Sequence, residues 1–525
     1  MIFRSSFPDI TIPELTFTDF TLQKAAERLT QPALIDGPSG RTLTYGQLLE
    51  YIRRVGANLH ARGFKKGDVL AILLPNLPEY AAAFHGAASI GGVLTTINPL
   101  YTAEELTFQL SDTRAKYLLT LPMFIEKAIE GAKNTSIEEI FVLGEAPGAT
   151  PFAALLQPAD SAPPVNIDVH RDLLVIPYSS GTTGLPKGVM LTHNNVVSFV
   201  SMIRVAAGYH PGQKYLAVLP FFHIFGMVGI MGNCLVAGAT MVTMPRFDLE
   251  QFLQLIQDHK IAGACLVPPI VLALAKHPIV DKYDLSSLEW LLSGAAPLSA
   301  DLQKACAARL NCAVVQGWGM TETSCGASIV PLDQAGKRPG AAGMLIPNQE
   351  YRVVDYTTGE DQGPGHQGEI WLRGPNIMQG YLNQPQATAD TINSEGWLYT
   401  GDIGYIDEEG YLFIVDRIKE LIKYKGLQIA PAELEAVLLS HPAVADAAVI
   451  GRADEEAGEV PKAFVVLKSP VNAEELLAFV SEKVAPYKRI RKLEIIDQIP
   501  KSASGKILRR VLVAKERELE KEIIQ

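Results

Sequence analysis

The sequence predicts an α/β protein with a large N-terminal domain, residues 1–415, and a small α+β C-terminal domain, residues 416–525. A chain of 525 residues exceeds what one hydrophobic core usually supports, so at least two domains are expected. In the first half, helical and strand patterns alternate, which predicts parallel-rich sheets covered by helices. Further on, short alternating segments broken by Gly and Pro predict a small antiparallel β subdomain that ends near Asp416.

The first half contains several clear elements. Residues 44–60 have helical spacing, and "DVLAILLP" (Asp68–Pro75) is typical of a buried strand. Residues 78–90 form a small-residue helix suited to close packing on a sheet. "TAEE" (Thr102–Glu105) is a capping box and predicts another helix, followed by the strand "KYLLTL". The strand "DLLVIPYSS" leads directly into a loop rich in Ser, Thr and Gly.

The C-terminal region has its own alternation of helices and strands. Pro431 near a first turn and Asn472 as an N-cap predict two helices, and "VADAAVIG" and "KAFVVLK" predict strands between them. We find no internal repeat and no long low-complexity linker. A compact unit with a boundary near Asp416 is therefore expected.

Composition excludes several classes of protein. The net charge of −11 argues against a nucleic-acid-binding surface. Five cysteines without a C-x-x-C pair predict reduced thiols in a cytoplasmic protein, neither a disulfide framework nor a zinc site. Neither terminus carries a secretory or lipidation signal. The stretch 216–244 lacks charged residues, but Pro220, His223, Asn233 and four glycines favour a buried helix and strand over a membrane span.

The loop "YSSGTTGLPKGVMLTH" (Tyr178–His193) has the composition of a phosphate cradle, with flexible backbone, hydroxyl groups and one lysine. It is not a P-loop, because Pro186 precedes Lys187 and Gly188 follows it, where a P-loop needs Ser or Thr. "GVML" predicts a strand directly after the loop, and Thr192 is then expected to cap a helix. The loop therefore lies between two strands.

The segment "YSSGTTGLPKGV" resembles the signature of the acyl-adenylate-forming superfamily, which includes acyl-CoA synthetases, 4-coumarate–CoA ligases, beetle luciferases and peptide-synthetase adenylation domains. Further motifs follow in the family's order, so the resemblance spans nearly the whole chain. It implies ATP, Mg²⁺ and coenzyme A as ligands. The loop residues that would hold the β- and γ-phosphates of ATP are Ser179, Ser180, Gly181, Thr182, Thr183, Gly184 and Lys187.

Two further segments, "LLSGAAPL" (Leu291–Leu298) and "VVQGWGMTETS" (Val314–Ser324), resemble the family's adenine site. In "VVQGWGMTETS" the ring of Trp318 stands between two glycines, which suits stacking on a flat base. The resemblance places Thr321 near the α-phosphate and makes Glu322 a ligand of Mg²⁺, a role that suits a carboxylate. The implied nucleotide-binding residues in these two segments are Gly294, Ala295, Ala296, Gln316, Gly317, Trp318, Gly319, Met320, Thr321 and Glu322.

The remaining motifs imply a ribose site, a catalytic lysine and a hinge. By resemblance, Asp402 and Arg417 hold the ribose, and Lys506 in "IPKSASGKILRR" contacts the substrate carboxylate and the α-phosphate. The family rotates its mobile C-terminal lid domain between half-reactions, here at a hinge from Asp416 to Lys419. Rotation would withdraw Lys506 and bring a segment for coenzyme A to the site, namely Lys423, Lys425, Gly426 and Gln428. The basic run Tyr487–Lys492 could hold the coenzyme's phosphates or be a solvated face.

The acyl pocket is expected along "LPFFHIFGMVG" (Leu219–Gly229), which contains no acidic residue to pair an amino group. The resemblance implies His223, Phe225, Gly226, Met227, Gly294 and Gly317 as pocket residues, with His223 and Thr321 beside Lys506 in catalysis. Plant 4-coumarate–CoA ligases usually carry a tyrosine where this chain has Phe225, and a polar residue slightly further on. Because a site without polar partners disfavours a buried hydroxyl, the hypothesis is an apolar acid: a medium- or long-chain fatty acid, or an aryl acid such as cinnamate.

The expected activity is that of a stand-alone ATP-dependent carboxylate–CoA ligase, which releases pyrophosphate and then AMP. The alternatives are a 4-coumarate–CoA ligase proper, a luciferase-like oxygenase of its own adenylate, and a nucleotide-gated scaffold with a dead site. The last is disfavoured because every charged motif residue is present. The expected partners are a small carboxylic acid, ATP and coenzyme A, without nucleic acid or a membrane span. Peripheral membrane contact stays open, as does a monomer or a homodimer.

Overall fold

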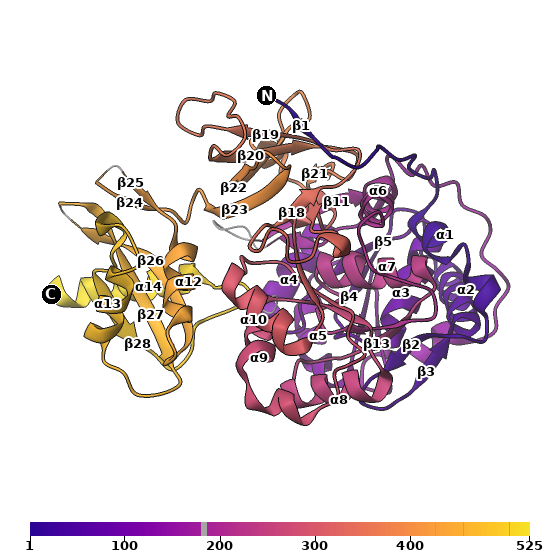
Figure 1. Ribbon diagram of the computed structural model, residues 1–525. Helices are drawn as coiled ribbons and strands as arrows, with labels where there is room; N and C mark the ends of the chain where they lie inside the picture. Colours follow the sequence, from indigo (N-terminus) through magenta and orange to yellow (C-terminus); the bar gives the residue numbers. More distant parts are fainter. Residues whose placement is uncertain (180–185, 426, 455, 503–504, 525) are drawn as a thin grey trace.

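The computed structural model describes residues 1–179, 186–425, 427–454, 456–502 and 505–524. Figure 1 shows a large N-terminal body, a layer of antiparallel strands beside it and a small C-terminal domain. The predicted α/β class is confirmed, because sheets and helices alternate through both domains.

The first sheet has fourteen strands, and one half of it is parallel apart from the terminal hairpin of β2 and β3. Its strands, in spatial order, are β3 (Thr42–Thr44), β2 (Pro32–Asp36), β13 (Thr240–Thr243), β12 (Lys214–Ala217), β14 (Gly263–Leu266), β15 (Trp290–Ser293) and β16 (Ala313–Trp318). Because parallel strands run in one direction, the loops after β12, β14, β15 and β16 all leave from the same edge of the sheet.

The other half of this sheet is antiparallel. It continues from β16 through β17 (Ser328–Ile329), β18 (Gly343–Leu345), β23 (Tyr411–Arg417), β22 (Leu398–Ile406), β20 (Gly368–Arg373), β19 (Glu350–Val354) and β1 (Phe3–Arg4). The antiparallel strands that the sequence predicts as a β subdomain are therefore hydrogen-bonded to the parallel sheet.

The second sheet is also largely parallel and contains the predicted strands of the first 180 residues. Its order is β10 (Tyr178–Ser179), β11 (Lys187–Thr192), β9 (Leu173–Val175), β5 (Val93–Thr96), β4 (Val69–Ile72), β6 (Tyr117–Thr120), β7 (Glu139–Val142) and β8 (Thr150–Pro151), and β21 (Gly380–Tyr381) pairs with β11. Strands β4, β5 and β6 are buried throughout, as expected of parallel strands covered on both faces.

Three helices of the large domain begin at threonine caps, two of which, Thr102 and Thr192, are predicted from the sequence. Thr44, Thr102 and Thr192 each accept a hydrogen bond from the third residue of the helix that follows, in a reciprocal capping box. The helices are α1 (Phe17–Leu22), α2 (Tyr45–Ala61), α3 (Pro78–Ser89), α4 (Ala103–Thr113), α5 (Ile125–Ala132), α6 (His193–Ile203), α8 (Leu249–His259), α9 (Pro268–Lys276), α10 (Ala300–Leu310) and α11 (Pro385–Ala389). The 3₁₀ turns are η1 (Ala25–Arg28), η2 (Pro122–Phe124), η3 (Phe152–Leu156), η5 (Pro278–Lys282), η6 (Thr321–Thr323), η7 (Leu332–Gln334) and η8 (Pro486–Lys488).

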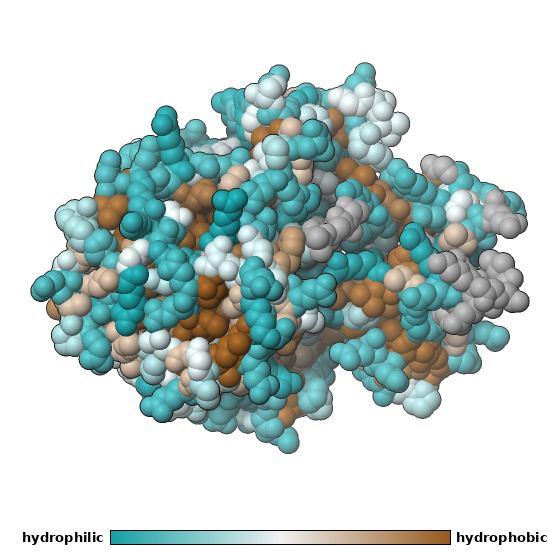
Figure 2. Space-filling model, turned by 180° about the vertical axis from the view of Figure 1, so that it is seen from behind, coloured by the Kyte–Doolittle hydropathy of each residue, from teal (hydrophilic) through white to brown (hydrophobic). Residues whose placement is uncertain are grey.

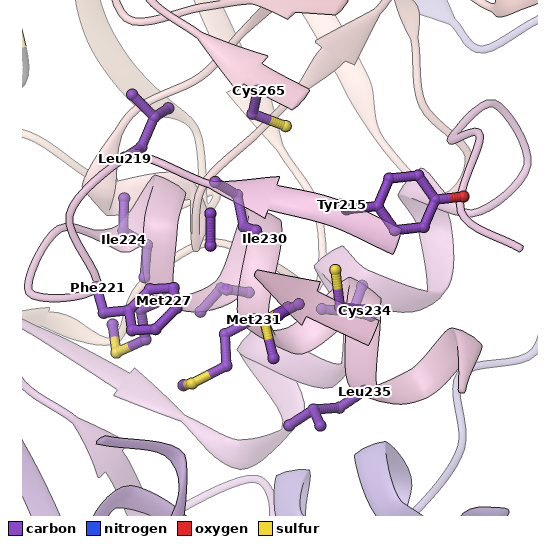
Figure 3. Close-up of a cluster of buried hydrophobic side chains, with 14 of the residues drawn as sticks. Tyr215, Leu219, Phe221, Ile224, Met227, Ile230, Met231, Cys234, Leu235 and Cys265 are labelled. Carbon is purple, nitrogen blue, oxygen red and sulfur yellow. The ribbon is translucent and has the colours of Figure 1, made fainter. Parts of the chain in front are cut away.

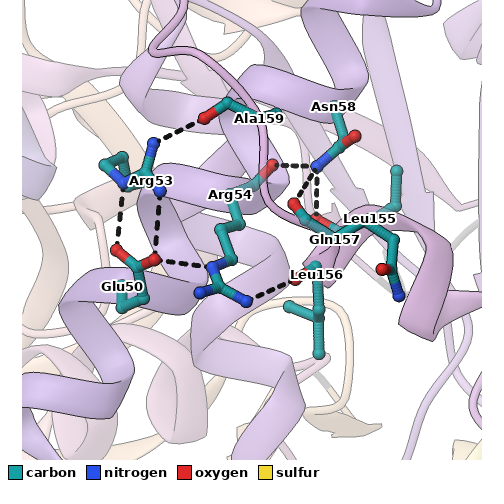
Figure 4. Close-up of polar contacts among 8 residues, drawn as sticks. All are labelled: Glu50, Arg53, Arg54, Asn58, Leu155, Leu156, Gln157 and Ala159. Carbon is teal, nitrogen blue, oxygen red and sulfur yellow. Dashed lines mark hydrogen bonds and ion pairs between the residues drawn. The ribbon is translucent and has the colours of Figure 1, made fainter.

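Helix α2 holds the long segment that leads from η3 toward β9. Figure 4 shows that Arg53, Arg54 and Asn58 point from α2 toward backbone carbonyls of residues 155–159. Asn58 Nδ2 donates to the carbonyls of Leu155 and Gln157, at 3.1 and 3.0 Å. These bonds satisfy the backbone of a segment that has few strand or helix partners of its own.

The charge-free stretch 216–244 is buried, as predicted. It contains the end of β12, a π-helical turn η4 (Phe225–Gly232), helix α7 (Asn233–Ala237) and β13. Figure 3 shows its Phe, Ile, Leu and Met side chains packed among the surrounding elements. In the part of the chain that the structure describes, no helix has the length and apolar character needed to cross a bilayer.

The small domain is built on a third, five-stranded sheet. Its strands are β25 (Leu427–Ile429), β24 (Ile422–Tyr424), β27 (Gly458–Leu467), β26 (Val444–Asp454) and β28 (Lys492–Ile495), and its helices are α12 (Pro431–Ser440), α13 (Ala473–Ser481) and α14 (Arg509–Ile524). Pro431 is the first residue of α12 and Asn472 caps α13, as predicted. Sheet membership changes between Arg417, which ends β23, and Ile422, which begins β24.

The surface and the thiols agree with the composition. In Figure 2 hydrophilic side chains cover most of the rear face, and a hollow separates the small domain from the large body. All five cysteines are free thiols, and Cys234, Cys265 and Cys306 are buried.

Two buried histidines lie between helices α1, α3 and α6. The His193 Nδ1 atom accepts from the Phe17 amide at 3.0 Å, and the His85 Nδ1 atom lies 3.1 Å from Thr18 Oγ1. Within the described residues, neither Nε2 atom has a hydrogen-bond partner. Burial lowers the pKa of His85 to about 3 and that of His193 to about 4, so both rings are neutral in the folded protein.

These histidines should make folding sensitive to acid. In the unfolded chain the pKa of each histidine is about 6.5. Below that pH the unfolded chain binds a proton at each ring and the folded chain does not. The free energy of unfolding therefore falls by about 1.4 kcal/mol per pH unit for each ring. The loss continues until the folded rings protonate, near pH 4 and pH 3. Melting temperatures measured from pH 7.5 to pH 5 should fall less steeply in His85→Gln than in the wild type. The exposed His366→Gln should leave the slope unchanged; equal slopes in all three proteins would contradict the assignment.

Candidate functional site

A cavity opens at the edge where β12, β14, β15 and β16 end, a usual place for ligands in α/β proteins. The loop after β12 supplies His223 and Phe225, and the turn after β15 supplies Gly294 and Ala295. Strand β16 supplies Gly317 and Trp318, and the small domain supplies Lys506. Thus the topology brings together motifs that are nearly 300 residues apart in sequence.

The cavity wall combines a polar group of residues with a larger apolar one. The polar group includes Trp318, Thr321, His223, Lys506, Tyr209, Asn233 and Ser328. The apolar group includes Phe199, Ile203, Ala206, Phe225, Trp290, Leu292, Ile329 and Leu332. The arrangement can hold a charged head group beside an apolar chain or ring.

His223 is a neutral ring in this wall. Its Nδ1 atom accepts a hydrogen bond from the Phe225 amide at 3.3 Å, so the proton resides on Nε2. Burial, together with the nearby Lys506 charge, lowers the pKa of His223 to about 3. A neutral imidazole next to an ammonium can donate one hydrogen bond without adding positive charge.

Lys506 reaches the cavity from a tight turn of the small domain. Its amide donates to Ser502 Oγ at 3.1 Å, and its carbonyl accepts from the Ser502 amide at 2.8 Å. Desolvation and the Arg417 charge lower the pKa of Lys506, while Asp402, Glu322 and Glu420 oppose that change. The charges of Arg417, Asp402 and Glu322 therefore act on this ammonium.

Asp402 is the centre of a small hydrogen-bonded group. One carboxylate oxygen accepts from Trp318 Nε1 at 2.9 Å, and the other pairs with Arg417 Nε at 2.9 Å. Asp402 is 4% exposed, and its charge raises the pKa of Arg417. Strands β22 and β23 place the two charges in register, because Asp402 lies opposite Arg417. Each carboxylate oxygen retains a lone pair for a ribose hydroxyl.

A second charged group surrounds Tyr381. The Tyr381 hydroxyl donates to Glu322 Oε1 at 2.8 Å, and Lys187 Nζ lies 4.7 Å from the centre of the Tyr381 ring. Strand β21 pairs with β11 through Tyr381 and Val189, two residues beyond Lys187. Ser179 ends β10, whereas Ser180, Gly181, Thr182, Thr183 and Gly184 lie outside the described residues.

Glu322 could hold a magnesium ion. It is 4% exposed, and among the described residues no group of three His, Cys, Asp or Glu side chains has the spacing of a metal site. A single protein carboxylate suits Mg²⁺ that takes its other ligands from phosphates and water. The residues present therefore fit an ion that arrives with a nucleotide.

Several predicted site residues lie outside the cavity wall. Gln316 is buried, and its amide donates to Leu298 O and Gln303 Oε1, so it supports β16 from behind. Gly226 and Met227 are buried beneath the wall, and Ala296 lies just beyond it. Lys423, Lys425 and Gln428 lie on the β24–β25 hairpin of the small domain, and Gly426 lies outside the described residues.

The structure also adds cavity residues that sequence motifs did not indicate. Tyr209 donates through its hydroxyl to Gly229 O at 3.2 Å, and Asn233 Nδ2 donates to the same carbonyl at 3.1 Å. Asn233 Oδ1 is buried and has no partner in the described part of the chain. These residues come from a loop and a π-helical junction, and no motif spacing marks them.

Gly226 is required by a close approach to the backbone. A Cβ atom there would lie 2.1 Å from the Pro220 carbonyl oxygen, which accepts the His223 amide at 3.1 Å. Gly226→Ala should therefore displace His223 and cost about 1–3 kcal/mol of stability. Thermal melting measures the loss of stability. Gly363→Ala, which has no described neighbour within 4 Å, is the control. Equal melting temperatures in the two variants would contradict this account.

Comparison with known proteins identifies both domains. The sequence profile of the AMP-binding enzyme family matches residues 22–382, and that of the AMP-binding enzyme C-terminal domain matches residues 433–506. The chain is 44% identical to 4-coumarate–CoA ligase 2 of Nicotiana tabacum, over 98% of this chain and 97% of the relative. It is 43% identical to 4-coumarate–CoA ligase 1 of Petroselinum crispum, with the same coverage.

Solved structures agree with this placement. The anthranilate CoA ligase AuaEII superposes with a TM-score of 0.90 at 28% identity, covering 97% of this chain and 99% of that one. The o-succinylbenzoate CoA synthetase of Bacillus subtilis gives a TM-score of 0.81 at 31% identity, covering 94% and 97%. The chain therefore belongs to the AMP-binding enzyme family, in the acyl-CoA synthetase branch that includes 4-coumarate–CoA ligases, and it is an ATP-dependent, AMP-forming acid–CoA ligase.

Proposed function

We propose that this ligase activates an acid with a largely apolar acyl group, an arylpropenoic acid such as cinnamate or a medium- to long-chain fatty acid. The observation that carries the proposal is one cavity in which Lys506 and Thr321 stand beside a wall of aromatic and aliphatic side chains. The curated relatives are named for a hydroxylated arylpropenoic acid, which favours an aryl group over an alkyl chain.

In the first half-reaction, a carboxylate oxygen bonds to the α-phosphorus of ATP, and the bond from that phosphorus to the pyrophosphate oxygen breaks. Both reactants are anions, so the site must offset their repulsion. Lys506 lies among the nucleotide residues and would stabilise charge as the two anions meet. Lys187 would neutralise the departing phosphates, and magnesium held by Glu322 would add to that neutralisation when bound.

The nucleotide would lie along the remaining motif residues. The Trp318 ring stands at the cavity wall next to Gly294 and Ala295, where an adenine base would stack. Asp402 and Arg417 would take the ribose hydroxyls, because each Asp402 oxygen has a free lone pair.

In the second half-reaction, the coenzyme A sulfur bonds to the acyl carbon, the bond from that carbon to AMP breaks, and the thiol proton passes to water. Lys423, Lys425 and Gln428 are proposed to bind the coenzyme, yet their hairpin is outside the cavity wall. The proposal therefore includes rotation of residues 416–525 about Asp416–Lys419. In the described conformation Tyr356 donates to Gln428 Oε1 at 2.6 Å, a contact that rotation must break.

A second candidate is an arylpropenoic acid with a ring hydroxyl. The observation that favours it is Asn233 Oδ1, a buried acceptor in a residue of the cavity wall. Its amide orientation is set, since Nδ2 donates to Val228 O and Gly229 O at 3.4 and 3.1 Å. A substrate hydroxyl that reached Oδ1 would satisfy it.

Lys506→Ala tests whether Lys506 acts in the first half-reaction but not in the second. Exchange between ATP and pyrophosphate should fall about 100-fold or more, because a charge aimed at the transition state is lost. Thioester formation from supplied cinnamoyl-AMP and coenzyme A should stay within about twofold. The control is Lys515→Ala, which removes a half-exposed lysine of the same domain. An equal fall in both half-reactions would rule out a role confined to the first step.

A substrate panel distinguishes the two candidate acids. With an apolar pocket, kcat/KM for cinnamate should match or exceed that for 4-coumarate, and octanoate should be used. If Asn233 accepts the ring hydroxyl, kcat/KM should be higher for 4-coumarate than for cinnamate. Asn233→Leu should then lower the ratio of these two kcat/KM values about tenfold. A preference for 4-coumarate that survives in Asn233→Leu would rule out this use of Asn233.

A further inference from the structure

Arg509 lies three residues after Lys506, as the first residue of helix α14. Its Nη2 atom donates to both carboxylate oxygens of Glu435, each at 2.8 Å, so one nitrogen makes a bifurcated contact. Its Nη1 atom donates to Glu420, and its Nε atom donates to the Val449 carbonyl at 3.2 Å. Only 16% of the side chain is exposed, so the guanidinium is largely enclosed by these partners.

These partners belong to three separate elements. Glu420 lies in the segment that joins the two domains, Glu435 in α12, and Val449 in β26. The Val449 amide also donates to Glu435 Oε1 at 2.8 Å, which closes the group. Arg509 therefore fastens the start of α14 to the joint between the domains and to the body of the small domain.

The neighbouring carboxylates depend on this positive charge. Burial raises the pKa of Glu435 to about 6, and the Arg509 charge opposes that rise. Asp416 is 6% exposed; burial raises its pKa, and Arg509 again opposes the rise. Asp416 accepts the amides of Arg417 and Ala432 at 2.8 and 3.0 Å, so it joins the end of β23 to α12.

The described residues on either side of the Lys506 turn are hydrogen-bonded to one another. Leu508 donates to the Pro500 carbonyl at 2.8 Å, and Lys501 bridges to Ile507. Before the turn, Lys501 Nζ pairs with Asp446 at 2.6 Å; after it, Arg509 makes the contacts described above. The direction in which Lys506 points from the small domain therefore depends on these flanking anchors and on the packing of Ile499 and Leu512.

We propose that Arg509 is a positioning residue for Lys506, which it orients toward the cavity by tying the Lys506 turn to Glu435 and to Glu420 beside the hinge. The inference rests on the proposed role of Lys506 in the first half-reaction. Arg509 is not among the cavity-lining residues. The three guanidinium nitrogens contact Val449 O, Glu420 and Glu435 at the same time, whereas a lysine ammonium has a single nitrogen and cannot reach all three.

Arg509→Lys tests the proposal while keeping the charge that the buried carboxylates need. Exchange between ATP and pyrophosphate should fall about 10- to 100-fold, because small displacements of a catalytic group are costly. Thioester formation from supplied cinnamoyl-AMP should stay within about twofold. The matched control is Arg510→Lys, the same change at the adjacent, exposed position, and it should leave both half-reactions within about twofold.

A double-mutant cycle with Lys506→Ala shows whether Arg509 acts through Lys506. In the Lys506→Ala background, Arg509→Lys should cause no further loss of exchange. Losses that multiply, or an equal loss in both half-reactions with a lower melting temperature, would overturn the proposal and leave Arg509 a structural residue. If Lys506→Ala itself spares exchange, the proposed role of Lys506 fails, and that outcome is distinct from a failure at Arg509.

Discussion

The cavity is built by the large domain, but the lysine at its wall, Lys506, comes from the small domain. The small domain must therefore hold the Lys506 charge against the cavity. Removing an ammonium from water is unfavourable, and the pKa of Lys506 is lowered accordingly. The carboxylates of Asp402, Glu322 and Glu420 oppose that lowering of the pKa. The proposed role of Lys506 in the first half-reaction therefore depends on the position of the small domain.

The large domain meets this requirement through its topology. Parallel strands β12, β14, β15 and β16 end at one edge, and the antiparallel strands continue that sheet to β22 and β23. The register sets Asp402 opposite Arg417, directly before the segment that joins the two domains. Glu420 lies in the joining segment just beyond Arg417, and Arg509 contacts both Glu420 and Glu435.

Much of this could be predicted from the sequence, and the failures have physical causes. Capping residues such as Thr102 and Asn472 act on the neighbouring turn, so they marked helices correctly. The continuity of the two halves of the first sheet is a matter of long-range pairing between β16, β17 and β18, which no local pattern records. Gln316 and Met227 belong to site motifs, yet their side chains turn away from the cavity. Neighbours along a strand or helix alternate in direction, so a motif includes residues that support the site from behind.

The sequence by itself determined the α/β class, the family and the reaction, because these depend on short motifs with a local geometry. Only the tertiary structure decided that Tyr209, Trp290 and Asn233 line the cavity, and that Arg509 contacts Glu435 three residues beyond Lys506. Pocket walls and ion-pair networks form between segments far apart in the chain. Their partners are chosen by packing, and packing leaves no regular spacing in a single sequence.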